Sequence, residues 1–465
     1  MDNTLVLVDM NGNLKHTWEG KLVGFRPLPD GEVLSYIGDW KGGQQDAFCI
    51  RQYSFTGQVQ WEFRKWQQVD AIAGEPEENG KTWIARGHHD MQRHGVPGYY
   101  TEGVTATPAG GNTLVLSHVN ARDNRINPDV QLLSDAFYEV DPQGKVVWQW
   151  LSHEHVDQMG FDKAAFKAMQ SYPPADNPVA GRHKAKGRPG TGYDWMHINA
   201  LSYLGPNKWY DQGDARFHPD NVIFNSRDAN LFAIVDRKSG DIVWRIGPDY
   251  GPGSPYSKIG QIVGAHAVHI IPRGLPGEGN VLVFDNGGLG GYGAPNPAVP
   301  ITGFHNARRD YSRVLEINPI TYEIVWEYSY YKANPEKMLG HMGYRFFSPF
   351  VSYAQRLPNG NTLITEGDGN RVFEVTAGYE MVWEYINPYT LSSTKTDLTY
   401  RAYRVPYNWV PQLDRPREVA VTPPHNAQLH LPNDAGEMPD IGINQETMPV
   451  KAAPADDGPS GMHSY

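Results

Sequence analysis

The chain has 465 residues, a formal net charge of −11 and a single cysteine, Cys49. The sequence has no basic stretch interspersed with aromatic residues, so we do not expect it to bind nucleic acid. No apolar run reaches the ~18 residues of a membrane span. The lone cysteine excludes an internal disulfide and a cysteine-based metal cage, whereas 49 Gly, 36 Pro and 26 Tyr indicate many short strands joined by turns.

The N-terminal segment is already strand–turn–strand, "TLVLVDMNGNLKHTWEG" at 4–20. It has no basic region, apolar region or cleavage site of a secretory leader. We expect either a cytosolic protein or an exported one whose leader has been removed, and slightly favour the exported, periplasmic form.

A hairpin ending in tryptophan recurs along the chain. Each copy is an apolar strand, a turn rich in Asp, Asn or Gly, and a second strand that carries the tryptophan. The six copies lie at 4–20, 49–63, 136–150, 231–247, 313–328 and 371–385, with marker residues Trp18, Trp61, Trp148, Trp244, Trp326 and Trp383.

A second apolar hairpin precedes five of these copies, at 25–38, 106–118, 202–227, 269–287 and 354–367. Two hairpins make a four-stranded unit, and six such units in a ring bury both faces of every sheet. The sequence therefore predicts an all-β, six-bladed β-propeller over residues 1–410. The first unit lacks its leading hairpin, so we expect 399–410 to complete it.

The spacing between marker tryptophans is uneven, and the excess lies at 64–100, 151–193, 205–220, 248–265 and 286–310. Such insertions are typical of loops that cap a channel and shape a pocket. We expect one short helix at 162–169. Residues 411–465 predict a C-terminal extension that wraps the surface or is partly mobile.

The stretch "YDWMHINAL" (193–201) places His197 and Asn199 on one face of an expected inner strand. In a propeller that face lines the central channel. Other histidines and arginines fall at related places in successive repeats, although a single strand histidine is more often structural. The candidate catalytic residues are His197, His266, Arg313, His89 and His118, and the candidate substrate-binding residues are Asn199, Arg227, His305 and His341.

These residue types suit an anionic substrate. Arginine binds tetrahedral oxyanions through its planar fork, and histidine acts as a nucleophile, general acid or metal ligand near neutral pH. Few carboxylates accompany them, so a small aromatic or anionic molecule is the expected partner. No cofactor is certain, a divalent metal is possible, and a homo-oligomer is possible.

The motifs "DWMHIN", "NVIFNSRDANLFAIVDRKSGDIVWRIG", "YSRVLEINPITYEIVWEY" and "TYRAYRV" resemble those of bacterial arylsulfotransferases of the PQQ-independent propeller type, across roughly residues 4–405. That resemblance implies ping-pong transfer of a sulfuryl group between phenols through a sulfohistidine. The family's "DWxH" and "QH" histidines fall on His197 and His266, with Ala265 in place of Gln, and its "YSR" arginine falls on Arg313.

One departure concerns the nucleophile. The family's nucleophilic histidine is expected on the strand after "LPNGNTL", where this chain has "ITEGDGNRVFEV" with Glu366 and Asn370. Either His89, His118 or His341 takes the role, or the scaffold runs other chemistry. Three functions therefore stay open: a sulfotransferase, a lyase or hydrolase that holds a metal among His89, His118, His197, His266 and His305, and a non-catalytic binding propeller.

Overall fold

A computed structural model describes residues 4–38, 46–70, 77–96, 111–171, 192–293, 306–335, 342–389 and 398–420. The chain divides into two compact units, Met1–Pro416 and Arg417–Tyr465. Everything below concerns the first unit, and most of the expected C-terminal extension, residues 421–465, lies outside the described residues.

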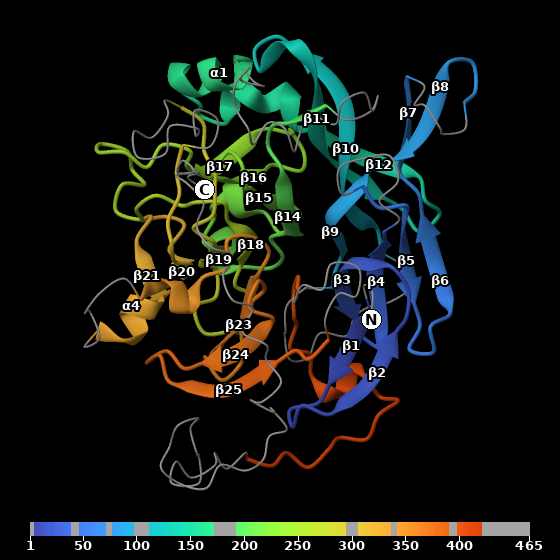
Figure 1. The fold of residues 1–465 in the computed structure, drawn as a ribbon, viewed down its shortest axis with the longest axis vertical. Helices are drawn as coiled ribbons and strands as arrows, with labels where there is room; N and C mark the ends of the chain where they lie inside the picture. Colours follow the sequence, from blue (N-terminus) through green and yellow to red (C-terminus); the bar gives the residue numbers. More distant parts are fainter. Residues whose placement is uncertain are drawn as a thin grey trace, which may run out of the picture. The chain divides into compact units, whose positions relative to one another are not determined.

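The first unit is all-β with a β-propeller arrangement. Five sheets each contain four strands in chain order. They are β3 (Leu22–Leu28), β4 (Glu32–Ile37), β5 (Cys49–Tyr53) and β6 (Val59–Phe63); β9 (Gly87–Arg93), β10 (Thr113–Asp123), β11 (Asn127–Val140) and β12 (Val146–Leu151); β14 (Ile198–Tyr203), β15 (Val222–Ser226), β16 (Leu231–Val235) and β17 (Ile242–Ile246); β18 (His266–Ile270), β19 (Val281–Asp285), β20 (Arg313–Ile317) and β21 (Ile324–Tyr328); β22 (Tyr353–Arg356), β23 (Thr362–Glu366), β24 (Arg371–Val375) and β25 (Met381–Ile386). In Figure 1 the first strands β3, β9, β14 and β18 face a common centre, and β6, β21 and β25 lie outside.

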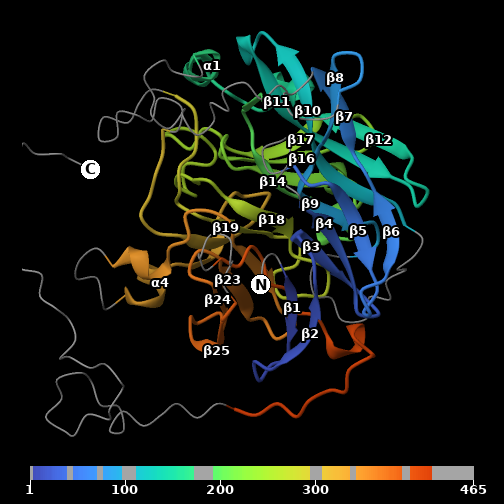
Figure 2. The same cartoon turned by 45° about the vertical axis from the view of Figure 1, so that its right-hand side comes forward.

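The prediction of six four-stranded blades is wrong. The first repeat forms only the two-stranded hairpin of β1 (Leu5–Val8) and β2 (Leu14–Trp18), beside β3 in Figures 1 and 2. The segment 399–410, expected to supply strands, has none; it is extended and ends in a short 3-10 helix, Tyr407–Trp409. Its backbone bonds instead to side chains of the fifth sheet, where the Arg404 amide donates to Gln355 Oε1. The Ala402 and Arg404 amides are satisfied by side chains, and among the described residues only Thr399 and Tyr400 make backbone bonds to the fifth sheet's neighbouring residues, so 399–405 forms no regular ladder.

The insertions contain more structure than expected. The region 64–100 holds the hairpin of β7 (Trp66–Asp70) and β8 (Lys81–Ala85), and also β9, the inner strand of the second sheet. The leading hairpin of this sheet is therefore β9–β10, so the predicted hairpin at 106–118 is wrong, and His88 and His89 lie on the inner strand. The expected helix is confirmed as α1 (Lys163–Gln170), capped by Asp162, and short β13 (Tyr193–Asp194) runs parallel to β11. Short helices α3 (Lys208–Asp211) and α4 (Tyr330–Ala333) fill two connections.

Tryptophan side chains connect each hairpin to the next. The indole N–H of Trp61 donates to the Pro142 carbonyl at 3.0 Å, and that of Trp244 to Pro319 at 2.8 Å. The same contact joins Trp326 to Ala377, Trp383 to Met10, and Trp18 to Ser54, so hairpin β1–β2 is included. In the second sheet Trp150, not the expected Trp148, makes the bond, to Gly240.

These bonds satisfy a buried donor and a turn carbonyl together, so their loss costs stability. We expect Trp244→Phe, which keeps the ring and removes the N–H, to lower the free energy of unfolding by about 1–2 kcal/mol. Trp83→Phe is the matched control, because Trp83 is 51% exposed. Urea denaturation of both variants measures the difference, and equal midpoints would contradict the assignment.

Candidate functional site

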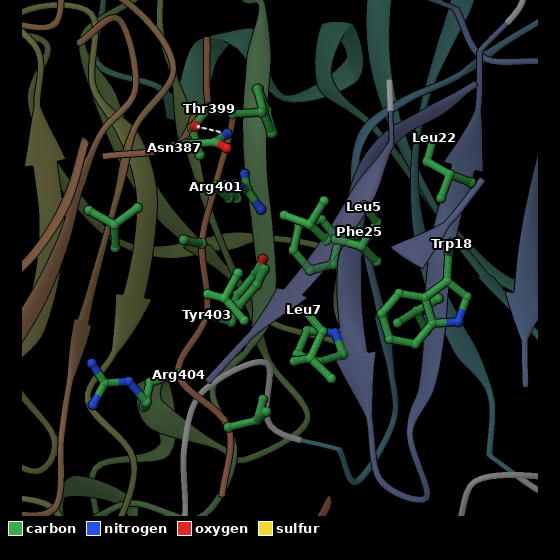
Figure 3. Close-up of a pocket in the computed structure, with 18 of the residues that line it drawn as sticks. Leu5, Leu7, Trp18, Leu22, Phe25, Asn387, Thr399, Arg401, Tyr403 and Arg404 are labelled. Atoms are coloured by element: carbon green, nitrogen blue, oxygen red, sulfur yellow. Dashed lines mark hydrogen bonds between the residues drawn. The ribbon is translucent and has the colours of Figure 1, made fainter. Parts of the chain in front are cut away.

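A cavity of about 660 Å³ opens beside the inner strands and the segment 398–410. Much of its wall is apolar: Figure 3 shows Leu5, Leu7 and Phe25 on one side and Tyr403 and Arg401 across from them. At the end toward the inner strands the lining is polar. Four sequence-predicted residues meet there: His89, His197, His266 and Arg227.

Inner-strand irregularities put these side chains in place. The backbone is left-handed (φ +47° to +70°) at Gly24, His89, His197 and Ala267, and the pairing register shifts nearby in all four sheets. A bulge breaks the strict alternation of faces and re-aims a side chain. A left-handed conformation is costly for residues other than glycine, so the surrounding sheets must hold it.

His197 is oriented by a carboxylate. Its Nδ1 lies 2.6 Å from Asp194 Oδ2, and its backbone N–H donates to Asp194 Oδ1. None of the residues that the structure describes hydrogen-bonds its Nε2, which is left for the cavity. The ring centroid lies 4.9 Å from that of His89 in an edge-on contact. An aspartate on Nδ1 fixes the tautomer with a lone pair on Nε2 and stabilises an imidazolium.

His266 uses both ring nitrogens within the protein. Nδ1 contacts Asn286 Oδ1 at 2.7 Å, and Nε2 accepts from the Val351 amide at 3.2 Å. Burial, reinforced by Arg227, holds its pKa well below the usual range. His266 is therefore a neutral wall of the cavity. Arg227 is the more available cation: the ion pair that it forms with Asp228 is 3.5 Å long, and its side chain is 28% exposed.

Three predicted residues lie away from the cavity lining. The Arg313 guanidinium donates to Asp285 at 2.7 and 2.9 Å and to the Ile259 and Gln261 carbonyls. Its donors are therefore used within the protein. Asn199 bridges two sheets, from the Ala265 carbonyl to Asn225. His118 is buried behind the cavity, with Nδ1 2.5 Å from Asp46. His305 and His341 fall outside the described residues.

Sequence reasoning missed the aromatic and charged residues of the closing segment. Tyr400 lines the cavity, and burial raises the pKa of its hydroxyl to about 12. Arg401 lines it too and binds Asp90 at 3.0 Å. Glu366, at the position expected for the family's nucleophile, instead accepts from the Phe347 amide and pairs with Arg371. The motif "TYRAYRV" was noticed for its likeness, and nothing in it signals which side chains reach the cavity.

A second histidine cluster lies behind the first. His88, His118 and Asp135 are buried, and one ligand atom from each lies within 4.8 Å of the others. Imidazole and carboxylate are the ligands of Zn²⁺ and related divalent metals, so among the described residues this group fits a metal.

A family model for arylsulfotransferase (ASST) matches residues 102–401. The chain belongs to the arylsulfotransferase family. Membership supports an arylsulfotransferase-like function, that of a sulfotransferase-type transferase. A search of curated proteins gave no match. No helix among the described residues is long and apolar enough to cross a membrane.

Solved structures with a similar fold are distant from this arylsulfotransferase-family chain. A protein of unknown function from Bacteroides caccae is 10% identical, covering 86% of this chain and 93% of that one, with a TM-score of 0.41. Virginiamycin B lyase from Staphylococcus aureus is 11% identical over 84% and 79%, with a TM-score of 0.32. Apo AztD from Citrobacter koseri is 9% identical over 83% and 92%, with a TM-score of 0.34.

Buried neutral histidines make stability depend on pH. Burial lowers the pKa of His266 well below 6.5 and that of His269 to about 3. The unfolded chain then binds more protons below pH ~6.5, so the free energy of unfolding falls as pH drops, by up to about 1.4 kcal/mol per pH unit for each imidazole.

Urea unfolding measured between pH 7.5 and pH 5 is expected to show this decrease in the free energy of unfolding. The His266→Asn variant is expected to have a smaller slope, because it lacks the contribution of one imidazole. His94→Asn is the control, because His94 is half exposed. A stability that stays level or rises toward pH 5 would contradict the burial of neutral imidazoles.

Proposed function

We propose that the chain transfers a sulfuryl group from an aryl sulfate to a phenol, with His197 as the nucleophile. The observation that carries this proposal is the Asp194–His197 pair, whose Nε2 has no described protein partner in a cavity shared with Arg227 and His89. The bond from Asp194 leaves a lone pair on Nε2 and offsets the positive charge of a sulfated imidazole.

The first half-reaction forms an N–S bond. The Nε2 lone pair of His197 attacks sulfur, the S–O bond to the aryl group breaks, and the phenolate leaves as an anion that accepts a hydrogen bond from the neutral His89 ring and takes its proton from water. Arg227, as a planar donor, binds the sulfate oxygens in this step. Apolar and aromatic lining, including Phe350 and Tyr400, suits the aryl ring.

The second half-reaction reverses these roles. An acceptor phenol that has lost its proton to water accepts a hydrogen bond from His89, its oxygen attacks sulfur, and the N–S bond to His197 breaks. The sum is one aryl sulfate plus one phenol giving a new phenol and a new aryl sulfate, with no nucleotide required. His266 holds the cavity wall through Val351 and Asn286, and takes no proton because it is buried neutral.

His197→Asn is expected to lower kcat by at least about 10³-fold with a chromogenic aryl sulfate and a phenol acceptor, because the nucleophile is removed. Asp194→Asn is expected to cost about 10–10²-fold, since it loses orientation and charge but keeps the nucleophile. The controls are His94→Asn and Asp220→Asn, which break an exposed His–Asp pair at 3.2 Å and are expected to leave kcat unchanged.

Intact mass of the protein quenched with donor alone is expected to show one added sulfuryl group, absent in His197→Asn. A rate of phenol release that does not depend on the acceptor concentration would support a hydrolase instead. A His197→Asn variant with full activity would overturn the assignment of the nucleophile.

Arg227→Gln is expected to raise KM for the aryl sulfate about 10–10²-fold by removing the cation that binds the sulfate. Arg227→Lys keeps the charge and loses the two-pronged geometry, so an intermediate KM is expected. Arg313→Lys, which alters an arginine already paired with Asp285, is the control for the cavity. An unchanged KM in Arg227→Gln, measured by initial rates, would remove Arg227 from the site.

A further inference from the structure

We propose that His88, His118 and Asp135 bind one divalent transition-metal ion of the Zn²⁺ type. The three residues come from neighbouring strands of one sheet: His88 from β9, His118 from β10 and Asp135 from β11, with His118 directly opposite Asp135 in the ladder. The inference goes beyond sulfuryl transfer and does not depend on it.

Three polar atoms of this cluster are buried and lack a hydrogen bond of ordinary geometry. They are His88 Nε2, His118 Nε2 and Asp135 Oδ2. The three side chains are at most 1% exposed, so water does not satisfy these atoms from outside. Leaving a buried polar atom unpaired costs about 1–3 kcal/mol, and one cation would satisfy all three.

The spacing fits metal ligands better than a hydrogen bond. His88 Nε2 lies 3.4 Å from Asp135 Oδ1, and no hydrogen bond joins them. Two ligands at Zn–N and Zn–O distances of about 2.0–2.2 Å in a tetrahedron are roughly 3.3–3.5 Å apart. The imidazoles of His88 and His118 stack with centroids 3.6 Å apart and planes 16° apart, and binding one ion would turn the rings out of this stack so that both Nε2 lone pairs reach it.

Outer contacts orient each ligand as they do in metal sites. His118 Nδ1 lies 2.5 Å from Asp46, which is itself paired with Arg86, so Nε2 carries the lone pair. The Ile198 amide donates to Asp135 Oδ1. A carboxylate behind a ligand histidine and a backbone donor on a ligand carboxylate are the usual second contacts of a bound metal.

Local charge also favours a cation. Asp194 and Asp228 place further carboxylates near Asp135. Arg86, a nearby cation, is occupied by Asp46 and Asn120. The Ser117 backbone also interacts with the His88 ring as a hydrogen-bond partner, and a bound ion would compete with it.

The metal cluster touches the cavity through one hydrogen bond. His88 Nδ1 lies 2.8 Å from His89 Nδ1. A metal on His88 Nε2 requires the proton on Nδ1, which then donates to His89 and leaves the His89 proton on Nε2. His88 would thus be a positioning residue that fixes which nitrogen of His89 donates.

The test is metal content and metal-dependent stability of the full chain. After chelator treatment, incubation with Zn²⁺ and desalting, we expect about one Zn²⁺ per chain by elemental analysis, and a higher Tm than for the chelated protein. Asp135→Asn keeps the acceptor for Ile198, and His118→Asn removes a ligand. Both are expected to lose at least tenfold in Zn²⁺ affinity and the Tm increase.

The variants His94→Asn and Asp220→Asn control for Zn²⁺ held by surface pairs and are expected to keep full stoichiometry. Cooperative unfolding of the Asp135→Asn variant without Zn²⁺ would show that the variant is folded, so that its loss of Zn²⁺ binding is not a loss of fold. Stoichiometry below about 0.1 in the wild type with no Tm shift, or equal Zn²⁺ binding by Asp135→Asn, would overturn the site. Neither readout uses sulfuryl transfer.

Discussion

A single buried carboxylate joins the inner strands. Asp90 on β9 receives Arg26 from β3 at 3.0 Å and Arg401 from the closing segment at 3.0 Å, and also accepts from the Leu201 amide of β14. Burial alone would raise its pKa, but the two guanidinium groups hold it below the usual range. A buried charge needs such partners, so segments far apart in the chain are fixed at one place.

That fixed centre lets the neighbouring backbone adopt unusual conformations. His89 directly precedes Asp90 in the chain and has a left-handed φ, and His197 on the next inner strand is left-handed too. Strands held at their ends by ion pairs and ladders tolerate the bulges that turn these imidazoles into the cavity. Behind them the same two strands position His88 and, through Ile198, Asp135. The reaction cavity and the metal cluster are thus two layers of one packed centre.

The repeat was visible in the sequence because its physical signal is local. Alternating strands, tight turns and a tryptophan in the last strand predicted all six tryptophan hairpins and four of the five leading ones, and failed for the leading hairpin of the second sheet. The count of blades failed because 399–410 carries alternating apolar residues but satisfies its amides with the side chains of Thr365 and Gln355. Trp150 replaced Trp148 because both indoles end the same strand, and only packing decides which reaches Gly240.

The sequence by itself determined the all-β class and most of the hairpins, since strand periodicity is a local property. It also named His89, His197, His266 and Arg227, which line one cavity, among its nine candidates. Tertiary structure alone decided that Arg313 pairs with Asp285 and that Asn199 bridges two sheets. It also brought His88, His118 and Asp135 into one cluster. Such contacts join residues tens to hundreds of positions apart, and bulges change the face a side chain takes, so no pattern within one strand encodes them.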